Sequence, residues 1–228
     1  MEVGDVFLKL DKEWDMQELA NLSKLYIQCY SLVYSLSGFE IDSDDERVVD
    51  WFKGIYGKYP WRGGFSTVNF YHSLYSRVPY DERPVISEIQ YASPGHIKLK
   101  EALLVAGILA GIVAAVTSSL DDIHETYNKI QHGMSQRKLT KLDVSLKELE
   151  LEKARLEFVR ESKKELIEKM KIPQTMQGEL YRRSDGNELM ELKILMSFHR
   201  RVEPLAIMPS IGMLDVEKPN IEKSNNAN

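Results

Sequence analysis

The stretch from Ala102 to Leu120 has no charged residue in nineteen positions, and this feature limits the possible folds more than any other. As an α-helix it would be about 28 Å long, close to the thickness of the hydrocarbon core of a bilayer. An apolar helix of this kind must be covered by lipid or by the core of a protein domain. The sequence leaves both interpretations open, and a run of this length in a chain of this size favours the membrane.

Small residues recur along this segment at helical spacing. Alanines follow every four residues from Ala102, and Gly107 and Gly111 lie in a second row beside them. The two rows would make one face of the helix smooth, with the bulky side chains mainly on the other side. A smooth face lets a second backbone approach closely. We therefore predict a helix-packing interface formed by Ala106, Gly107, Ala110, Gly111, Ala114 and Ala115.

The composition excludes several classes of protein. The chain has 228 residues, 35 acidic against 30 basic side chains and a formal net charge of −5, which disfavours a nucleic-acid partner. Cys29 is the single cysteine, so a monomer can build neither a disulfide nor a cysteine-based zinc site, as expected for a reducing compartment. The N-terminus lacks the pattern of a secretory signal, so we expect a cytoplasmic N-terminal domain. If 102–120 spans the inner membrane, Lys98 and Lys100 favour a cytoplasmic start.

Local patterns predict an α+β fold. Residues 6–10 alternate as a strand, and Asp15 with Glu18 forms a capping box at the start of a helix that ends near Ser37. Residues 84–92 alternate as a second strand, and the chain after the following turn reads as helical throughout. A further helix is expected to end before Pro204, which would leave 205–208 as an apolar piece suited to an edge strand.

These elements suggest a division of the chain into four parts. Residues 1–95 form a small α/β domain, and 96–172 form a helical extension. The extension holds the apolar helix 102–120 and a charged helix, 137–171. Residues 173–216 form a C-terminal helical segment, and 217–228 form a flexible polar tail.

The charged helix carries two apolar stripes at seven-residue spacing, roughly half a turn apart. A helix with apolar stripes on opposite sides needs two partners, and the second could be another subunit. Alternatively, one stripe is simply exposed leucine, which is common on protein surfaces. The stripes consist of Leu142, Leu149 and Leu156, and of Val144, Leu151 and Phe158.

The sequence contains no recognisable motif for catalysis, a cofactor or a metal. It has no phosphate-binding Gly-rich loop, GxSxG, HExxH or CxxC motif. The nearest metal-like group follows the apolar segment, but about 12 Å of helix separates its two histidines, which is too far for one ion. We therefore predict no metal site, no cofactor and no enzymatic activity. The group consists of Asp121, Asp122, His124, Glu125 and His132.

An aromatic and glycine-rich stretch is the best candidate for a ligand or partner site. Aromatic and arginine side chains are common anchors of interfaces, although such aromatics can equally build the core of a small domain. Two arginine pairs, Arg182–Arg183 and Arg200–Arg201, are interpreted as helix-end charges. The predicted site residues are Trp61, Arg62, Gly63, Gly64 and His72.

Three functions are consistent with these observations. The first is a non-enzymatic interaction protein that forms homo-oligomers or binds a protein partner, tethered to a membrane by 102–120 or not. The second is a membrane-acting effector whose N-terminal sensor domain controls the apolar helix. The third is a soluble small-ligand-binding module with its site near Trp61 and Arg62.

Overall fold

The computed structural model describes residues 1–11, 13–37, 52, 54–57, 65–91, 95–139 and 153–216. The predicted tail, 217–228, and residues 140–152 of the predicted charged helix lie outside the described residues. The α+β fold class is confirmed. The elements are β1 (Val3–Leu10), α1 (Met16–Leu36), α3 (Phe65–Arg77), η1 (Tyr80–Glu82), β2 (Val85–Gln90), β3 (Gly95–Ala102), α4 (Leu103–Ser118), α5 (Leu120–Gln136), α6 (Lys153–Lys169), α7 (Gln174–Arg183), α8 (Glu188–Ser210) and β4 (Leu214–Val216).

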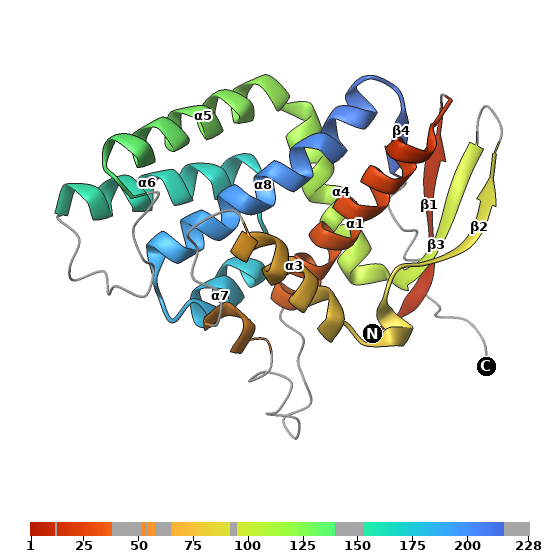
Figure 1. Ribbon diagram of the computed structural model, residues 1–228, viewed down its shortest axis with the longest axis horizontal. Coiled ribbons are helices and arrows are strands. Elements are labelled where there is room, and N and C mark those ends of the chain that lie inside the picture. Colours follow the sequence, from red (N-terminus) through yellow and green to blue (C-terminus); the bar gives the residue numbers. More distant parts are fainter. Residues whose placement is uncertain are drawn as a thin grey trace, which may run out of the picture.

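The four strands form one antiparallel sheet in the order β2-β3-β1-β4. Along the central pair, Val3 lies opposite Ala102 and Leu10 lies opposite Gly95. The sheet stands at one end of the molecule, with α1 against one of its faces and the other helices beyond (Figure 1). The side chains of β1 and β3 that face α1 are buried and join the core, whereas the opposite face carries Phe7, Lys98 and other partly exposed residues.

Strand β3 corrects the expectation that the chain after the turn is helical. Residues 96–102 begin the predicted helical extension, yet together with Gly95 they form the strand between β1 and β2. Ile97 and Leu99 alternate with Lys98 and Lys100 as a half-buried strand requires. The alternation is short and runs directly into the apolar residues of α4, which hides it in the sequence.

The local predictions for β1, α1 and β2 hold. Strands β1 and β2 form where the alternation places them, and α1 ends at Leu36 with Ser37 as its C-cap. The capping box is present: the Asp15 carboxylate accepts from the Glu18 amide at 2.7 Å, and the Glu18 carboxylate accepts from the Asp15 amide at 2.9 Å. These bonds satisfy amides that the first turn of a helix leaves without partners.

Helix α4 is a core helix, and its faces differ from the predicted ones. The inward face is buried against α8, α1 and the sheet, and it combines bulky side chains with alanines. The outward face carries the glycine row together with Leu104, which is 49% exposed. The separation into a small face and a bulky face is therefore wrong, because Ala106 and Ala110 turn inward with the bulky residues, whereas Ala114 is exposed. The inward residues include Val105, Ala106, Leu109, Ala110, Ile112, Val113 and Val116.

The apolar segment does not continue as one straight helix. Helix α4 ends at Ser118, and α5 leaves it at an angle of 91°. Among the described residues, no single helix has both the length and the apolarity of a membrane span, and only the bent pair of α4 and α5 passes that test together. The predicted straight helix over 102–120 is therefore interrupted at Ser119.

Helix α8 continues through the position where the sequence predicts its end. It runs from Glu188 to Ser210 and contains Pro204 and Pro209, so 205–208 are helical instead of forming an edge strand. Proline within a helix removes one backbone hydrogen bond. Burial compensates here, because Val202, Leu205 and Ala206 are buried and α8 packs along α4.

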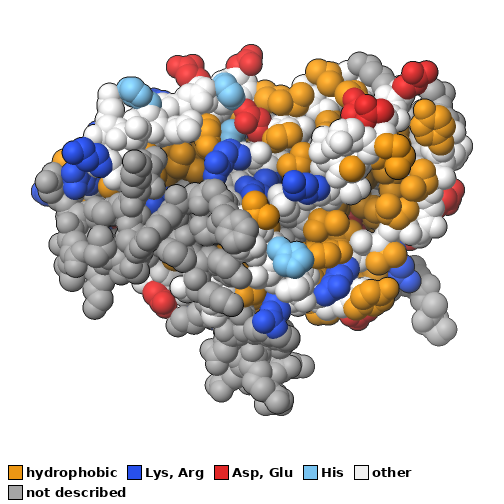
Figure 2. Space-filling view, in the orientation of Figure 1, with side chains coloured by type: hydrophobic (Ala, Val, Ile, Leu, Met, Phe, Trp, Pro, Cys, Tyr) orange, Lys and Arg blue, Asp and Glu red, His pale blue; other side chains and the backbone are white. Residues whose placement is uncertain are grey.

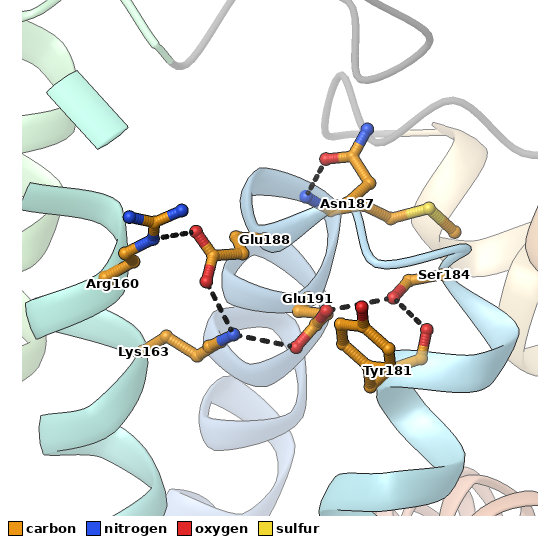
Figure 3. A network of polar contacts seen from close by, with 8 residues as sticks. Arg160, Lys163, Tyr181, Ser184, Asn187, Glu188 and Glu191 are labelled. Atoms are coloured by element: carbon orange, nitrogen blue, oxygen red, sulfur yellow. Dashed lines mark hydrogen bonds and ion pairs between the residues drawn. The ribbon is translucent and has the colours of Figure 1, made fainter. Parts of the chain in front are cut away.

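A polar network joins α6 to α8 (Figure 3). Lys163 of α6 lies between two carboxylates of α8, with its Nζ 3.4 Å from Glu188 Oε1 and 3.1 Å from Glu191 Oε2. The other Glu191 oxygen accepts from the Ser184 hydroxyl at 3.1 Å, and Arg160 Nε donates to Glu188 at 2.6 Å. Burial raises the pKa of Glu191, while Lys163 acts in the opposite direction. The network therefore fixes the start of α8 against α6.

A buried carboxyl lies where the sheet meets α1. Glu101 of β3 is fully buried, and its Oε1 accepts from the Tyr26 hydroxyl at 2.6 Å. Its Oε2 has no hydrogen-bond partner in the described part of the chain. Burial raises the pKa of Glu101 from 4.5 to about 8, because the low-dielectric surroundings disfavour the charged form.

Two helical glycines, one on α4 and one on α5, give a matched test of how these helices pack. A Cβ on Gly111 of α4 would meet nothing within 4 Å, whereas one on Gly133 of α5 would lie 2.5 Å from Phe158 Cζ. Gly111→Ala should raise the free energy of unfolding by about 1 kcal/mol through helix propensity. Gly133→Ala should lower it by about 1 kcal/mol or more, because the Phe158 ring must move. Urea denaturation measures both, and a stabilising Gly133→Ala would contradict the contact between α5 and α6.

The buried Glu101 should make stability depend on pH. Between pH 4.5 and about 8 the folded protein keeps the proton on Glu101, whereas the unfolded chain has released it. This residue therefore makes the protein less stable as the pH rises, by about 1.4 kcal/mol per pH unit. Glu101→Gln should remove that slope in urea denaturation at pH 5 to 8 and stabilise the protein at pH 8. Glu157→Gln, on the exposed side of α6, is the matched control and should leave the slope unchanged.

Candidate interaction surface

Strand β2 is exposed along its whole length. All six of its residues are exposed, including Val85 at 45%, Ile86 at 50% and Ile89 at 56%. Tyr91, the next residue, is 73% exposed. Single exposed apolar residues are common on protein surfaces, but several of them on one strand indicate an interaction surface. Val85 lies opposite Lys100, on the other side of the sheet from Ile86, so we call Ile86 and Ile89 the β2 surface.

The register shows to which side of the sheet Ile86 and Ile89 point. Ile86 lies opposite Leu99 and Ile89 lies opposite Ile97 across the β2–β3 pair. Paired residues on antiparallel strands point to the same side of the sheet. Both isoleucines therefore point to the side that α1 covers, where Leu99 and Ile97 are buried. The cover ends before it reaches β2.

An apolar groove runs between α1 and β2. It has a volume of about 90 Å³, and no charged residue lines it. Figure 2 shows hydrophobic side chains gathered beside α1 at the end of the molecule that holds the sheet. The groove thus continues the β2 surface inward to the core. Its lining consists of Leu8, Leu22, Ser23, Tyr26, Ile27, Pro84, Ile86, Ile97 and Leu99.

The outer edge of β2 is open to another strand. Strand β2 pairs with β3 on one side only, so it forms one edge of the described sheet. Proteins usually protect such an edge with lysines, prolines or a bulge. Between Val85 and Gln90 the chain has no lysine or proline, and its protective features are the charge of Glu88 and the bulge between Ile86 and Glu88.

The glycine row of α4 provides a second bare surface. A Cβ added to Gly111 would meet no described atom within 4 Å, and Gly107 and Ile108 are half-buried beside it. Of the predicted interface residues on this helix, Ala106, Ala110 and Ala115 are buried within the chain. The contact of the glycine row with another backbone stays a prediction, because within the described residues Gly111 faces outward.

The stripes of the charged helix are mostly not described. Leu142, Val144, Leu149 and Leu151 lie outside the described residues. Leu156 of α6 is half-buried, and Phe158 packs onto Gly133 of α5 with the Arg137 guanidinium 4.1 Å from its ring centre. Phe158 therefore already has a partner within the chain.

The predicted ligand site is largely undescribed. Trp61, Arg62, Gly63 and Gly64 lie outside the described residues. His72 is exposed on α3, the helix that follows. On either side of that stretch the described aromatics belong to the core: Phe70 is buried with its ring centre 5.1 Å from that of Tyr56 and 5.3 Å from that of Tyr71.

The metal-like residues are spread over separate contacts. His124 Nδ1 lies 2.5 Å from Glu203 of α8, Asp122 pairs with Lys169 of α6, and His132 contacts Gln136 at 2.8 Å. Within the described ranges, no group of three or more histidine, cysteine, aspartate or glutamate side chains is arranged to hold a metal ion.

Comparison of the chain with protein-family models, curated proteins and solved structures finds no match.

The sequence predicted that β2 is a strand, but it did not identify β2 as a candidate interaction surface. The signal was present: isoleucines and valine without lysine or proline, next to a turn. What the sequence does not carry is the strand order, which makes β2 an edge, and the place where α1 ends its cover.

Proposed function

We propose that this protein is a non-enzymatic interaction module that assembles with a second copy of itself through β2. The observation that supports this proposal is an edge strand whose six residues are all exposed, without a lysine and beside an apolar groove. Pairing of two edge strands would supply hydrogen-bond partners for the outer backbone groups of β2 and take its isoleucines out of water.

A second copy suits this edge because antiparallel pairing is self-complementary. In an antiparallel pair across a two-fold axis, each β2 presents to its partner the same groups that it receives. The two sheets would then form one continuous sheet, and Ile86 and Ile89 of both copies would lie on the side that holds the grooves. The apolar surface that each monomer leaves bare would be shared at the centre of the interface.

The charges on and beside β2 bear on such pairing. Glu88 is the single charged residue between Val85 and Gln90, and its carboxylate lies 3.6 Å from His96 Nε2 on β3. On the neighbouring strand, Lys98 pairs with Asp5 at 2.8 Å. Within the strand, pairing would therefore bring together two like charges, the Glu88 carboxylates, each beside the His96 ring of its own sheet.

The mass in solution tests this proposal. Size-exclusion chromatography with light scattering should show a dimer that dissociates on dilution. Ile86→Lys, which places an ammonium group in the groove, should shift the protein to monomer at every concentration tested, because the charge would have to be buried in the interface. Ile86 is exposed in the monomer, so this variant should fold normally, as circular dichroism would verify.

Two control variants sharpen the result. Ile211→Lys changes an isoleucine of nearly equal exposure, 49%, at the end of α8, and it should keep the dimer. Gly111→Leu fills the bare row of α4 and should also keep the dimer. A monomer in the unmodified protein would contradict self-assembly, and loss of the dimer with Gly111→Leu but not Ile86→Lys would move the interface from β2 to α4.

A further inference from the structure

A second, larger groove lies on another face of α1. It is an open hollow of about 500 Å³ between α1, α3 and α8. Helix α1 turns Leu22 and Tyr26 toward the apolar groove beside β2, and it turns Lys24 and Gln28 toward this one. The two grooves are therefore distinct surfaces. The lining of the larger one consists of Asn21, Lys24, Leu25, Gln28, Thr67, Val68, Arg200, Arg201, Pro204 and Met208.

The charge of this groove is opposite to that of the chain. Three of its ten lining residues are Lys24, Arg200 and Arg201, and none is acidic, although the whole chain has more acidic than basic residues. Figure 2 shows basic side chains over the middle of α8. Lys24 and Arg200 are exposed, and neither forms an ion pair with a described residue. Like charges repel, so their convergence favours an anion between them.

Arg201 is held in place without neutralisation of its charge. Its Nε donates to Gln28 Oε1 at 2.8 Å, and its Nη1 donates to the carbonyl and hydroxyl oxygens of Ser197 at 2.8 and 2.9 Å. Its guanidinium carbon lies 3.9 Å from the centre of the Tyr71 ring. All of these partners are uncharged. A fixed guanidinium beside two exposed cations that pair with no described residue suits a carboxylate or phosphate.

The position of these arginines corrects the sequence analysis. Arg200 and Arg201 were expected at a helix end, but α8 continues to Ser210, and the pair lies within the helix. By contrast, Arg182 and Arg183 do lie in the last turn of α7, where Arg182 pairs with Glu179 at 2.6 Å. Cations in the last turn of a helix are explained by its dipole, whereas those of α8 are not.

The remaining walls of the groove are apolar. Leu25, Val68, Pro204 and Met208 line it beside the cations, and Val68 is 53% exposed. Ligand sites commonly combine such walls with a few polar groups that fix orientation. We propose that this groove binds a small organic anion, namely a phosphate or carboxylate attached to an apolar body. Arg200, Arg201 and Lys24 contact the anionic group, and the apolar walls contact the body.

Phenyl phosphate is a suitable probe, because it joins a phosphate to an aromatic ring. Isothermal titration calorimetry should detect its binding to the full chain, weakening as salt is added. Benzyl alcohol, which keeps the ring without the charge, should bind far less. Arg200→Gln should weaken phenyl phosphate binding by at least about tenfold, because a charge-assisted contact is lost. Arg200 is exposed, so this variant should fold; Arg182→Gln, outside the groove, should bind as the unmodified protein does.

The same anionic chemistry occurs in lipid headgroups, and co-sedimentation with vesicles separates the two sources. Binding to phosphatidylglycerol-containing vesicles that is absent with phosphatidylcholine alone, and that Arg200→Gln weakens, assigns the groove to a headgroup; binding of phenyl phosphate assigns it to a free anion. Either result supports the site. It is overturned if neither probe binds, or if every probe that binds the unmodified protein binds Arg200→Gln as tightly.

Discussion

The helices that pack on the sheet leave one of its edges uncovered, and this limit determines where the candidate interaction surface lies. Helix α1 packs against the face that carries Leu99 and Ile97, and it stops short of β2. Helix α4 also contacts β1 and β3, and α8 contacts β4, so the helices cover the centre of the sheet and leave the edge at β2 in water. The same helix has a second boundary, with α3 and α8, where the cationic groove forms. Both candidate surfaces therefore follow from the place of α1.

Local signals in the sequence predicted the elements that depend on neighbouring residues. The capping box of Asp15 and Glu18 and the alternation in β1 and β2 act within a few residues, and the structure contains all of them. The missed elements depend on distant contacts. Strand β3 needs β1 and β2 on its two sides, and α8 passes Pro204 because Leu205 and Ala206 are buried, with α8 packed along α4.

The uncharged segment shows the same limit. Its length and composition are compatible with a bilayer or a core, and in a chain of this size they slightly favour the bilayer. In the structure, α4 packs against α8, α1 and the sheet, which bury most of its bulky residues and half of its small ones.

The candidate sites were harder still to predict from the sequence. The cationic groove is lined by residues of α1, α3 and α8, and no local sequence pattern indicates that Lys24 and Arg200 line the same groove.

Hydrogen–deuterium exchange in dilute and concentrated solution tests the central claim that the edge of β2 is covered by a second copy. The account predicts that amides of β2 exchange more slowly in the concentrated sample, because their outer hydrogen bonds form only in the dimer. Amides of α3, away from this edge, should exchange equally in both. Equal exchange of β2 at the two concentrations, together with an unchanged mass, would contradict the account.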